Sequence, residues 1–133
     1  MGAEHPLRIA SELARAGRID EAISCLEAAL ERARSMAERP ANTSLLARTA
    51  GLLCEEAGRL PQAARYYEEA LAVAAEREPL LLLALAEVHR RSGQVAGAQV
   101  CLDEAEALAR GSAEVDVALR VAQLGEAWAR DER

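Results

Sequence analysis

Three glycines, Gly17, Gly58 and Gly93, recur along the chain at intervals of 41 and 35 residues, and an aliphatic residue follows each of them two positions later. Glycine adopts the left-handed backbone conformation without strain, so it commonly ends a helix where the chain turns back. The positions seven before, five after and twelve after these glycines all hold small residues: Ala10, Gly51, Ala86, Ala22, Ala63, Ala98, Ala29, Ala70 and Ala105. Two antiparallel helices come closest where neither carries a bulky side chain at the crossing. The spacing therefore predicts three helical hairpins, one around each glycine.

The composition favours helix along almost the whole chain. Alanine fills 31 of the 133 positions, leucine, glutamate and arginine fill much of the rest, and these four are among the best helix formers. The sequence predicts an all-α protein of about seven helices, over residues 4–16, 19–38, 43–57, 60–77, 79–91, 95–110 and 112–131. Because the first spacing is the longer one, we expect the second helix to continue to Glu38, before Pro40 stops it. Gly111 and Ser112 are expected to end one helix and cap the next.

The second of these hairpins carries a family resemblance. Its order of small residue, turn glycine, aliphatic residue and spaced alanines, over Ala50–Leu71, resembles the tetratricopeptide repeat, and the resemblance extends over about residues 4–110. It implies an α-solenoid of antiparallel helix pairs. The implied organisation is a single domain over 1–133, with repeats at about 3–39, 43–78 and 79–110 and a capping helix at 112–131. Repeat three departs from the family pattern at Glu106, where an aliphatic residue is usual.

The last predicted helix lacks the turn glycine of the repeats. Its apolar residues Val117, Val121, Leu124 and Trp128 fall on one helical face. We therefore expect this helix to cover the apolar end of repeat three, as the terminal elements of repeat proteins do. Trp128 is accordingly interpreted as a core anchor of the cap rather than as a platform for a ligand.

Charge, hydropathy and cysteine content argue against several functions. The formal net charge is −6, and acidic residues are interspersed with arginines, so no basic face is concentrated enough to bind nucleic acid. The apolar run Leu80–Leu85 is too short to cross a membrane, and the N-terminus lacks the order of a signal peptide. Cys25, Cys54 and Cys101 are odd in number and far apart, which favours reduced, buried thiols in a cytoplasmic protein. Every basic residue is arginine, which indicates a GC-rich bacterial source.

No pattern of a catalytic or metal site occurs in the sequence. The two histidines, His5 and His89, have no metal-ligand partner at helical spacing, and His89 falls at a core position of its repeat. The glycines are explained by turns and do not form a phosphate-binding loop. Adjacent acidic pairs such as Glu55 and Glu56 diverge around a helix, as solvated residues do. We therefore expect no enzyme activity, no cofactor and no metal.

The resemblance also implies where a partner would bind, because the first helix of each tetratricopeptide pair lines an inner groove. The implied groove residues are Leu7, Ser11, Arg15, Leu45, Arg48, Leu52, Glu55, Glu56, Leu80, Leu83, Glu87, Arg90 and Arg91. Leucines form one wall and charges the far rim, which fits a peptide or amphipathic helix of another protein, with Arg48, Arg90 and Arg91 setting its register. The lysine, asparagine and arginine of the co-chaperone carboxylate clamp are missing, so we do not expect capture of a chaperone's C-terminal carboxylate.

Two alternatives to such an adaptor remain open. The leucine strip or the capping helix could meet a second copy of the chain in a two-fold homodimer. The chain could also be a chaperone or sensor subunit of a larger bacterial machine. Leu81 and Leu82 make the fifth helix apolar almost all round, so it either lies between neighbours or exposes a face to a partner. Repeat scaffolds share a fold and bind unrelated targets, so the sequence does not identify the partner.

Overall fold

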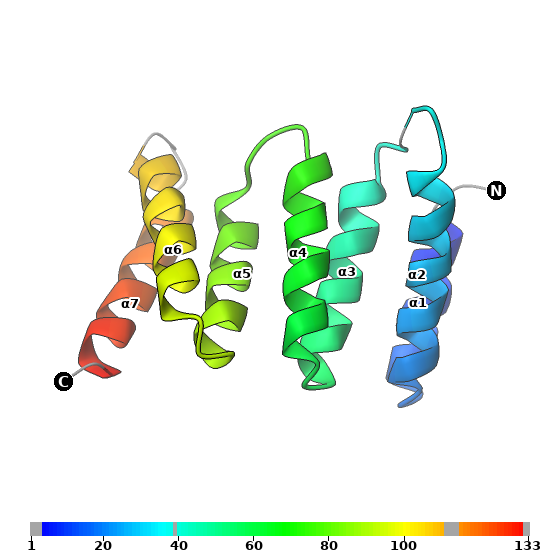
Figure 1. Ribbon diagram of the computed structural model, residues 1–133, viewed down its shortest axis with the longest axis horizontal. Coiled ribbons are helices and arrows are strands. Elements are labelled where there is room, and N and C mark those ends of the chain that lie inside the picture. Colours follow the sequence, from blue (N-terminus) through cyan, green and yellow to red (C-terminus); the bar gives the residue numbers. More distant parts are fainter. Residues whose placement is uncertain (1–3, 39, 111–114, 132–133) are drawn as a thin grey trace. The chain divides into compact units, whose positions relative to one another are not determined.

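A computed structural model describes residues 4–38, 40–110 and 115–131 of the chain. This part folds into seven α-helices: α1 (Glu4–Arg15), α2 (Ile19–Arg34), α3 (Thr43–Glu56), α4 (Leu60–Val73), α5 (Pro79–Arg91), α6 (Val95–Arg110) and α7 (Val115–Asp131) (Figure 1). The predicted all-α class is confirmed. None of the described helices combines the length and the apolar composition that a membrane span requires.

The three turn glycines take the conformation that their spacing predicts. Gly17, Gly58 and Gly93 have φ angles of 80°, 77° and 83°. In each turn the amide that follows the glycine donates a hydrogen bond of 2.8 Å to the carbonyl five residues earlier, which is the bond of a Schellman motif. A Cβ atom added to any of the three would meet nothing within 4 Å, so the backbone conformation, and not lack of space, favours glycine there.

The small residues lie where the helices of each pair touch. All nine of the predicted small positions, from Ala10 to Ala105, are buried. The pairs are α1 with α2, α3 with α4 and α5 with α6, and each reverses direction at one of the turn glycines. Side chains no larger than a methyl group allow the helix backbones to approach closely, so the recurring alanines determine the pairing.

The chain divides into two compact units, residues 1–75 and residues 76–133. Unit 1 contains α1 to α4, with α2 and α4 in one layer and α1 and α3 in the other (Figure 1). Its largest fully buried side chains include Leu26, Leu30, Leu46 and Tyr67. Unit 2 contains α5 to α7. The boundary falls between the second and third repeats, and the expected single domain remains a prediction.

Two helices end earlier than the sequence analysis predicted. The second was expected to reach Glu38, but α2 ends at Arg34. The Ser35 hydroxyl donates a hydrogen bond of 2.8 Å to the Arg32 carbonyl, and the Met36 amide bonds the carbonyl three residues earlier, so the last turn tightens and the α-helical ladder stops.

The fourth helix was expected to reach residue 77, but α4 ends at Val73. Ala74 is extended, with ψ of 143°, and this breaks the helix. Glu78 is extended as well, with ψ of 118°, because the ring of Pro79 disfavours the helical conformation in the residue before it. The residues between the two helices form a connection that leads directly into α5.

The last helix packs on unit 2 as the cap that the sequence predicted. It contacts α6 and, to a smaller extent, α5. Val121 and Trp128 are buried and Leu124 is half-buried, whereas the side chain of Val117 lies outside the described part. Trp128 is a core anchor, as predicted, with only 7% of its surface exposed. The expected helix stop and cap at Gly111 and Ser112 also lie outside the described residues.

Candidate functional site

The layer of unit 1 formed by α1 and α3 carries eight of the predicted groove residues. A shallow hollow of about 340 Å³ separates the two helices. Its lining includes Ser11 and Arg15 from α1 and Glu56 from α3, together with Ala14, Thr49 and Leu53. The two helices therefore bring three predicted residues, distant in sequence, to one concave surface.

Two leucines on α3 project beside this hollow. Leu45 is 48% exposed and Leu52 is 46% exposed, and they lie seven residues apart. Seven residues make almost two full helical turns, so the two side chains share one face of α3 about 10 Å apart along its axis. Leu7 on α1 is half-buried. A single exposed leucine is common, but two in line next to a hollow form an apolar strip that a partner side chain can cover.

A buried tyrosine holds Glu55 at the edge of the same face. The Tyr67 hydroxyl, on α4, donates a hydrogen bond of 2.8 Å to Glu55 Oε1 on α3. Tyr67 is fully buried. Burial, and next the hydrogen bond to Glu55, raise the pKa of Tyr67 far above its usual value, so the phenol keeps its proton and remains a donor. Glu55 therefore has a fixed place, whereas Glu56, one residue later, is exposed.

Gly51 makes room for this tyrosine. A Cβ atom at position 51 would lie 2.7 Å from Cε1 of the Tyr67 ring, closer than carbon atoms approach one another. The sequence analysis recognised Gly51 as a small packing position and Tyr67 as a filler between helices, but it did not predict their contact or the bond to Glu55. The available signal was that the second repeat alone places glycine at this position and tyrosine at the matching filler position.

The remaining predicted residues lie on α5 in unit 2, where they form a different surface. Leu80 is exposed, but Leu83 is 7% exposed and belongs to the core, so its assignment to an open groove is corrected. Leu81 and Leu82 are buried as well, which places the apolar fifth helix among neighbours. Arg91 is exposed at the end of the helix.

Arg90 and Glu87 are linked to the capping helix. The Arg90 guanidinium lies 5.4 Å from the centre of the Trp128 ring, the geometry of a cation–π contact, and 4.0 Å from the Glu87 carboxylate. Arg90 therefore helps to hold α7 on α5. Its predicted role in setting the register of a partner remains a prediction.

The cysteines and potential metal ligands offer no further site on these faces. Cys54 and Cys101 are buried and Cys25 is half-buried, and none forms a disulfide in the described structure. Burial raises the pKa of the Cys54 thiol. Across the described ranges, no three His, Cys, Asp or Glu side chains are grouped as metal ligands.

Comparison with known proteins places this architecture. In solved structures the chain is similar to NprR in complex with its cognate peptide NprX, with a TM-score of 0.76 and 17% identity, over 96% of this chain but only 39% of that one. It is also similar to PcrH in complex with the chaperone binding region of PopB, with a TM-score of 0.68 and 21% identity, over 92% of this chain and 96% of that one. No curated protein sequence matches it significantly. Residues 3–76 match the tetratricopeptide repeat. The chain belongs to the tetratricopeptide repeat family.

Proposed function

We propose that this protein is an adaptor that holds a peptide or helical segment of another protein on the α1/α3 face of unit 1. The observation that carries the proposal is the pair of exposed leucines, Leu45 and Leu52, beside the 340 Å³ hollow. Apolar side chains of a partner segment would cover these leucines, and charged residues at the rim would fix its orientation. The proposed activity is binding and involves no chemical step.

The geometry suits a partner with apolar residues at regular spacing. Leu45 and Leu52 are separated by about 10 Å along α3, which matches residues seven apart on a partner helix or three apart on an extended strand. Arg48 lies between the two leucines in sequence, and Glu55 and Glu56 follow them. A partner with an acidic residue near the middle of its contact and a basic residue near the end would complement these charges.

Two solved structures support this type of activity. NprR was crystallised with its cognate peptide and PcrH with the chaperone binding region of PopB, so both similar folds hold a segment of another molecule. We extend this to the present chain as a proposal that rests on its own exposed leucines. We also propose a bacterial cytoplasmic setting, in line with the all-arginine basic residues and the three free cysteines.

The experiment is affinity purification from the native host with quantitative mass spectrometry. The double variant Leu45→Glu/Leu52→Glu places two charges on the face, and we expect it to lose the partner that the wild-type chain captures. The matched control is Val100→Glu, because Val100 is 66% exposed on α6 and lies in unit 2. Circular dichroism should show the same helical content for all three proteins. Equal capture by the double variant and the wild type would refute the proposal.

Light scattering after size exclusion tests the homodimer alternative in the same samples. We expect a mass near 14.2 kDa at every concentration. A wild-type dimer that the double variant converts to a monomer would assign the leucine face to self-association instead.

A further inference from the structure

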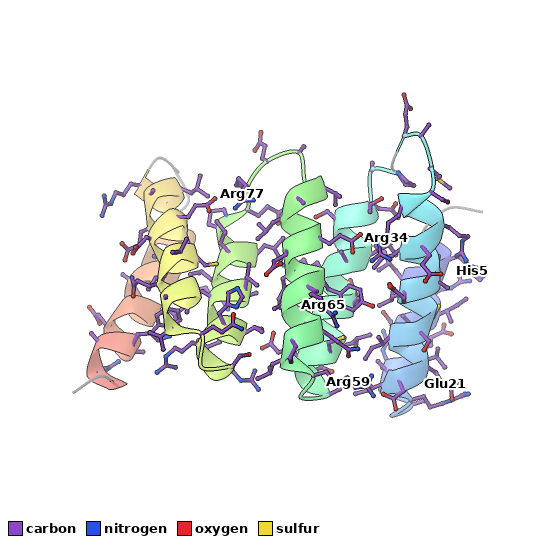
Figure 2. All side chains as sticks on the ribbon, viewed as in Figure 1. His5, Glu21, Arg34, Arg59, Arg65 and Arg77 are labelled. Carbon is purple, nitrogen blue, oxygen red and sulfur yellow. The ribbon has the colours of Figure 1, made fainter. Side chains whose placement is uncertain are left out.

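The other layer of unit 1 contains a larger and more polar hollow. Helices α2 and α4 border a trough of about 810 Å³. Long side chains bridge it at two places: Arg59 pairs with Asp20, and Arg34 forms bonds of 2.6 and 2.8 Å to the two oxygens of Glu69. Figure 2 shows Arg34, Arg59 and Arg65 on this layer. The binding proposed above uses the α1/α3 face, so the trough is a separate feature.

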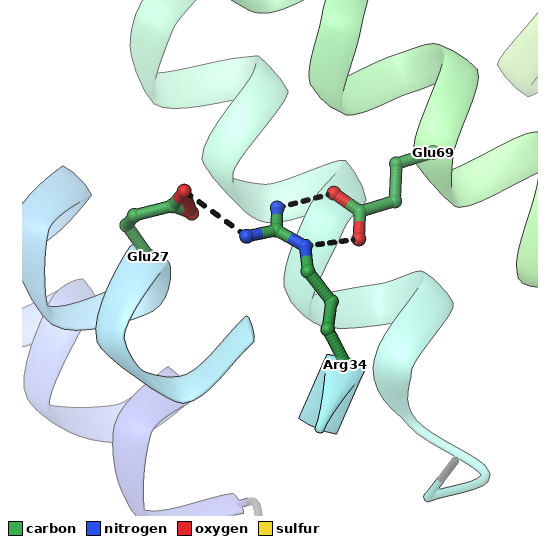
Figure 3. Close-up of polar contacts among 3 residues, drawn as sticks. All are labelled: Glu27, Arg34 and Glu69. Carbon is green, nitrogen blue, oxygen red and sulfur yellow. Dashed lines mark hydrogen bonds and ion pairs between the residues drawn. The ribbon is translucent and has the colours of Figure 1, made fainter. Parts of the chain in front are cut away.

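One carboxylate in this trough has bonding capacity left over. Glu27 Oε1 accepts a hydrogen bond of 3.2 Å from Arg34, which is already held by Glu69 from the opposite side (Figure 3). Glu27 Oε2 is buried and has no hydrogen-bond partner among the residues that the structure describes. A buried charged oxygen without a donor is unfavourable, and a carboxylate can accept about four hydrogen bonds. This oxygen is therefore suited to a donor from outside the chain.

The neighbours of Glu27 favour a positively charged donor. Glu31 lies one helical turn further along α2, lines the same trough and is exposed. Like charges at this spacing repel each other, and a cation between them relieves the repulsion. Tyr66 also lines the trough, and burial, then the nearby charge of Glu27, raise the pKa of its phenol to about 12. The ring stays uncharged at neutral pH, and a neutral aromatic ring attracts cations.

We infer that the α2/α4 trough of unit 1 is a second binding site, which takes an arginine side chain of a partner between Glu27, Glu31 and Tyr66. A guanidinium carries five donors in a plane, so it bonds the free oxygen of Glu27 and reaches a second carboxylate while its flat face stacks on the phenol ring. Lysine has the same charge but lacks this planar fork. Arg65, also in the trough, would repel the partner cation and is the feature that favours an anion instead.

The test uses three tripeptides with blocked ends, titrated into the full-length chain and followed by two-dimensional amide NMR. They are glycine–arginine–glycine, the same peptide with neutral citrulline, and glycine–glutamate–glycine. We expect the arginine peptide alone to shift the amides of α2 and α4, with a dissociation constant on the order of 1 mM. Glu27→Gln should weaken this binding about tenfold, because a charge-assisted hydrogen bond is lost.

A control separates the site from general attraction to an acidic protein. Glu12→Gln removes the same charge from an exposed position on α1 and should change the affinity less than about twofold. The variant Leu45→Glu/Leu52→Glu should bind the arginine peptide as the wild type does, so failure of the adaptor proposal would not mimic failure of this one. Equal binding of the citrulline peptide, preferential binding of the glutamate peptide, no shift at all, or equal effects of Glu27→Gln and Glu12→Gln would overturn the inference.

Discussion

The second and third repeats place different residues at equivalent positions around their turn glycines. Three residues before the glycine, repeat two has Glu55 and repeat three has Arg90. Glu55 accepts a hydrogen bond from Tyr67 of its own helix pair, whereas Arg90 stacks on Trp128 of the capping helix. The same backbone position is therefore fixed from inside the pair in unit 1 and from the added helix in unit 2.

The apolar strip also distinguishes the two repeats. Leu45 and Leu52 in repeat two correspond to Leu80 and Glu87 in repeat three. Only the first pair provides two exposed leucines in line, because Glu87 lies against Arg90. Repeats of one fold thus carry different surfaces, and the binding face follows from side chains that the fold itself does not require.

The largest expected effect concerns the anchor of the cap. Trp128→Ala removes a buried ring and the surface on which Arg90 stacks, and we expect it to lower the free energy of unfolding of unit 2 by about 3–5 kcal/mol. Denaturant titration followed by circular dichroism measures this. Leu119→Ala on the same helix is the control, because Leu119 is 54% exposed and should matter by less than about 0.5 kcal/mol. Equal losses in the two variants would show that Trp128 does not anchor the cap.

The contact between Gly51 and Tyr67 is the next test. Gly51→Ala adds a methyl group that would clash with the ring, and we expect a loss of about 1–3 kcal/mol in the free energy of unfolding. Repeat three has Ala86 and Leu102 at the same two positions. In a Tyr67→Leu background, which copies this pair, Gly51→Ala should therefore cost nothing. Thermal unfolding of the four proteins gives this double-mutant cycle, and additive effects would contradict the contact.

A smaller effect is expected when the hydroxyl alone is removed. Tyr67→Phe keeps the ring and deletes the hydrogen bond to Glu55, which should cost about 1 kcal/mol because Glu55 is partly solvated. Partner capture should also weaken, since Glu55 loses its fixed position on the binding face. If Tyr67→Phe is as stable as the wild type in denaturant titration, the bond does not stabilise unit 1.

High pH gives the weakest expected signal. The folded pKa of Tyr67 lies above its unfolded value of about 10, so the bonded phenol stabilises the chain fully below pH 10 and progressively less as the pH rises toward the folded pKa. Between pH 10 and 11 the wild type should lose about 1 kcal/mol more stability than Tyr67→Phe. Parallel stability curves for the two proteins over this range would contradict the raised pKa.

The helix pairs could be predicted because their signals are local and periodic. Glycine at a left-handed position and small residues at helical spacing depend on a few neighbouring residues, and Gly17, Gly58 and Gly93 and all nine small positions agree with the structure. The helix ends were less predictable, because one hydroxyl at Ser35 and one extended residue at Ala74 were enough to stop α2 and α4 early.

The binding face was predictable only in part. The repeat register placed Leu45 and Leu52 on an exposed face, but it placed Leu83 there too, and Leu83 is buried. Contacts between helices, such as Tyr67 with Glu55 or Arg90 with Trp128, depend on side-chain conformations that spacing does not specify. The α2/α4 trough was missed because the reasoning concerned the first helix of each pair only.

Site-specific photo-crosslinking in the native host tests the central claim most directly. Leu52 or Val100, both exposed, is replaced by the photoreactive p-benzoylphenylalanine. If the α1/α3 face of unit 1 holds the partner, irradiation should yield a crosslinked species from position 52 and none from position 100. A crosslink from position 100 alone would contradict this account.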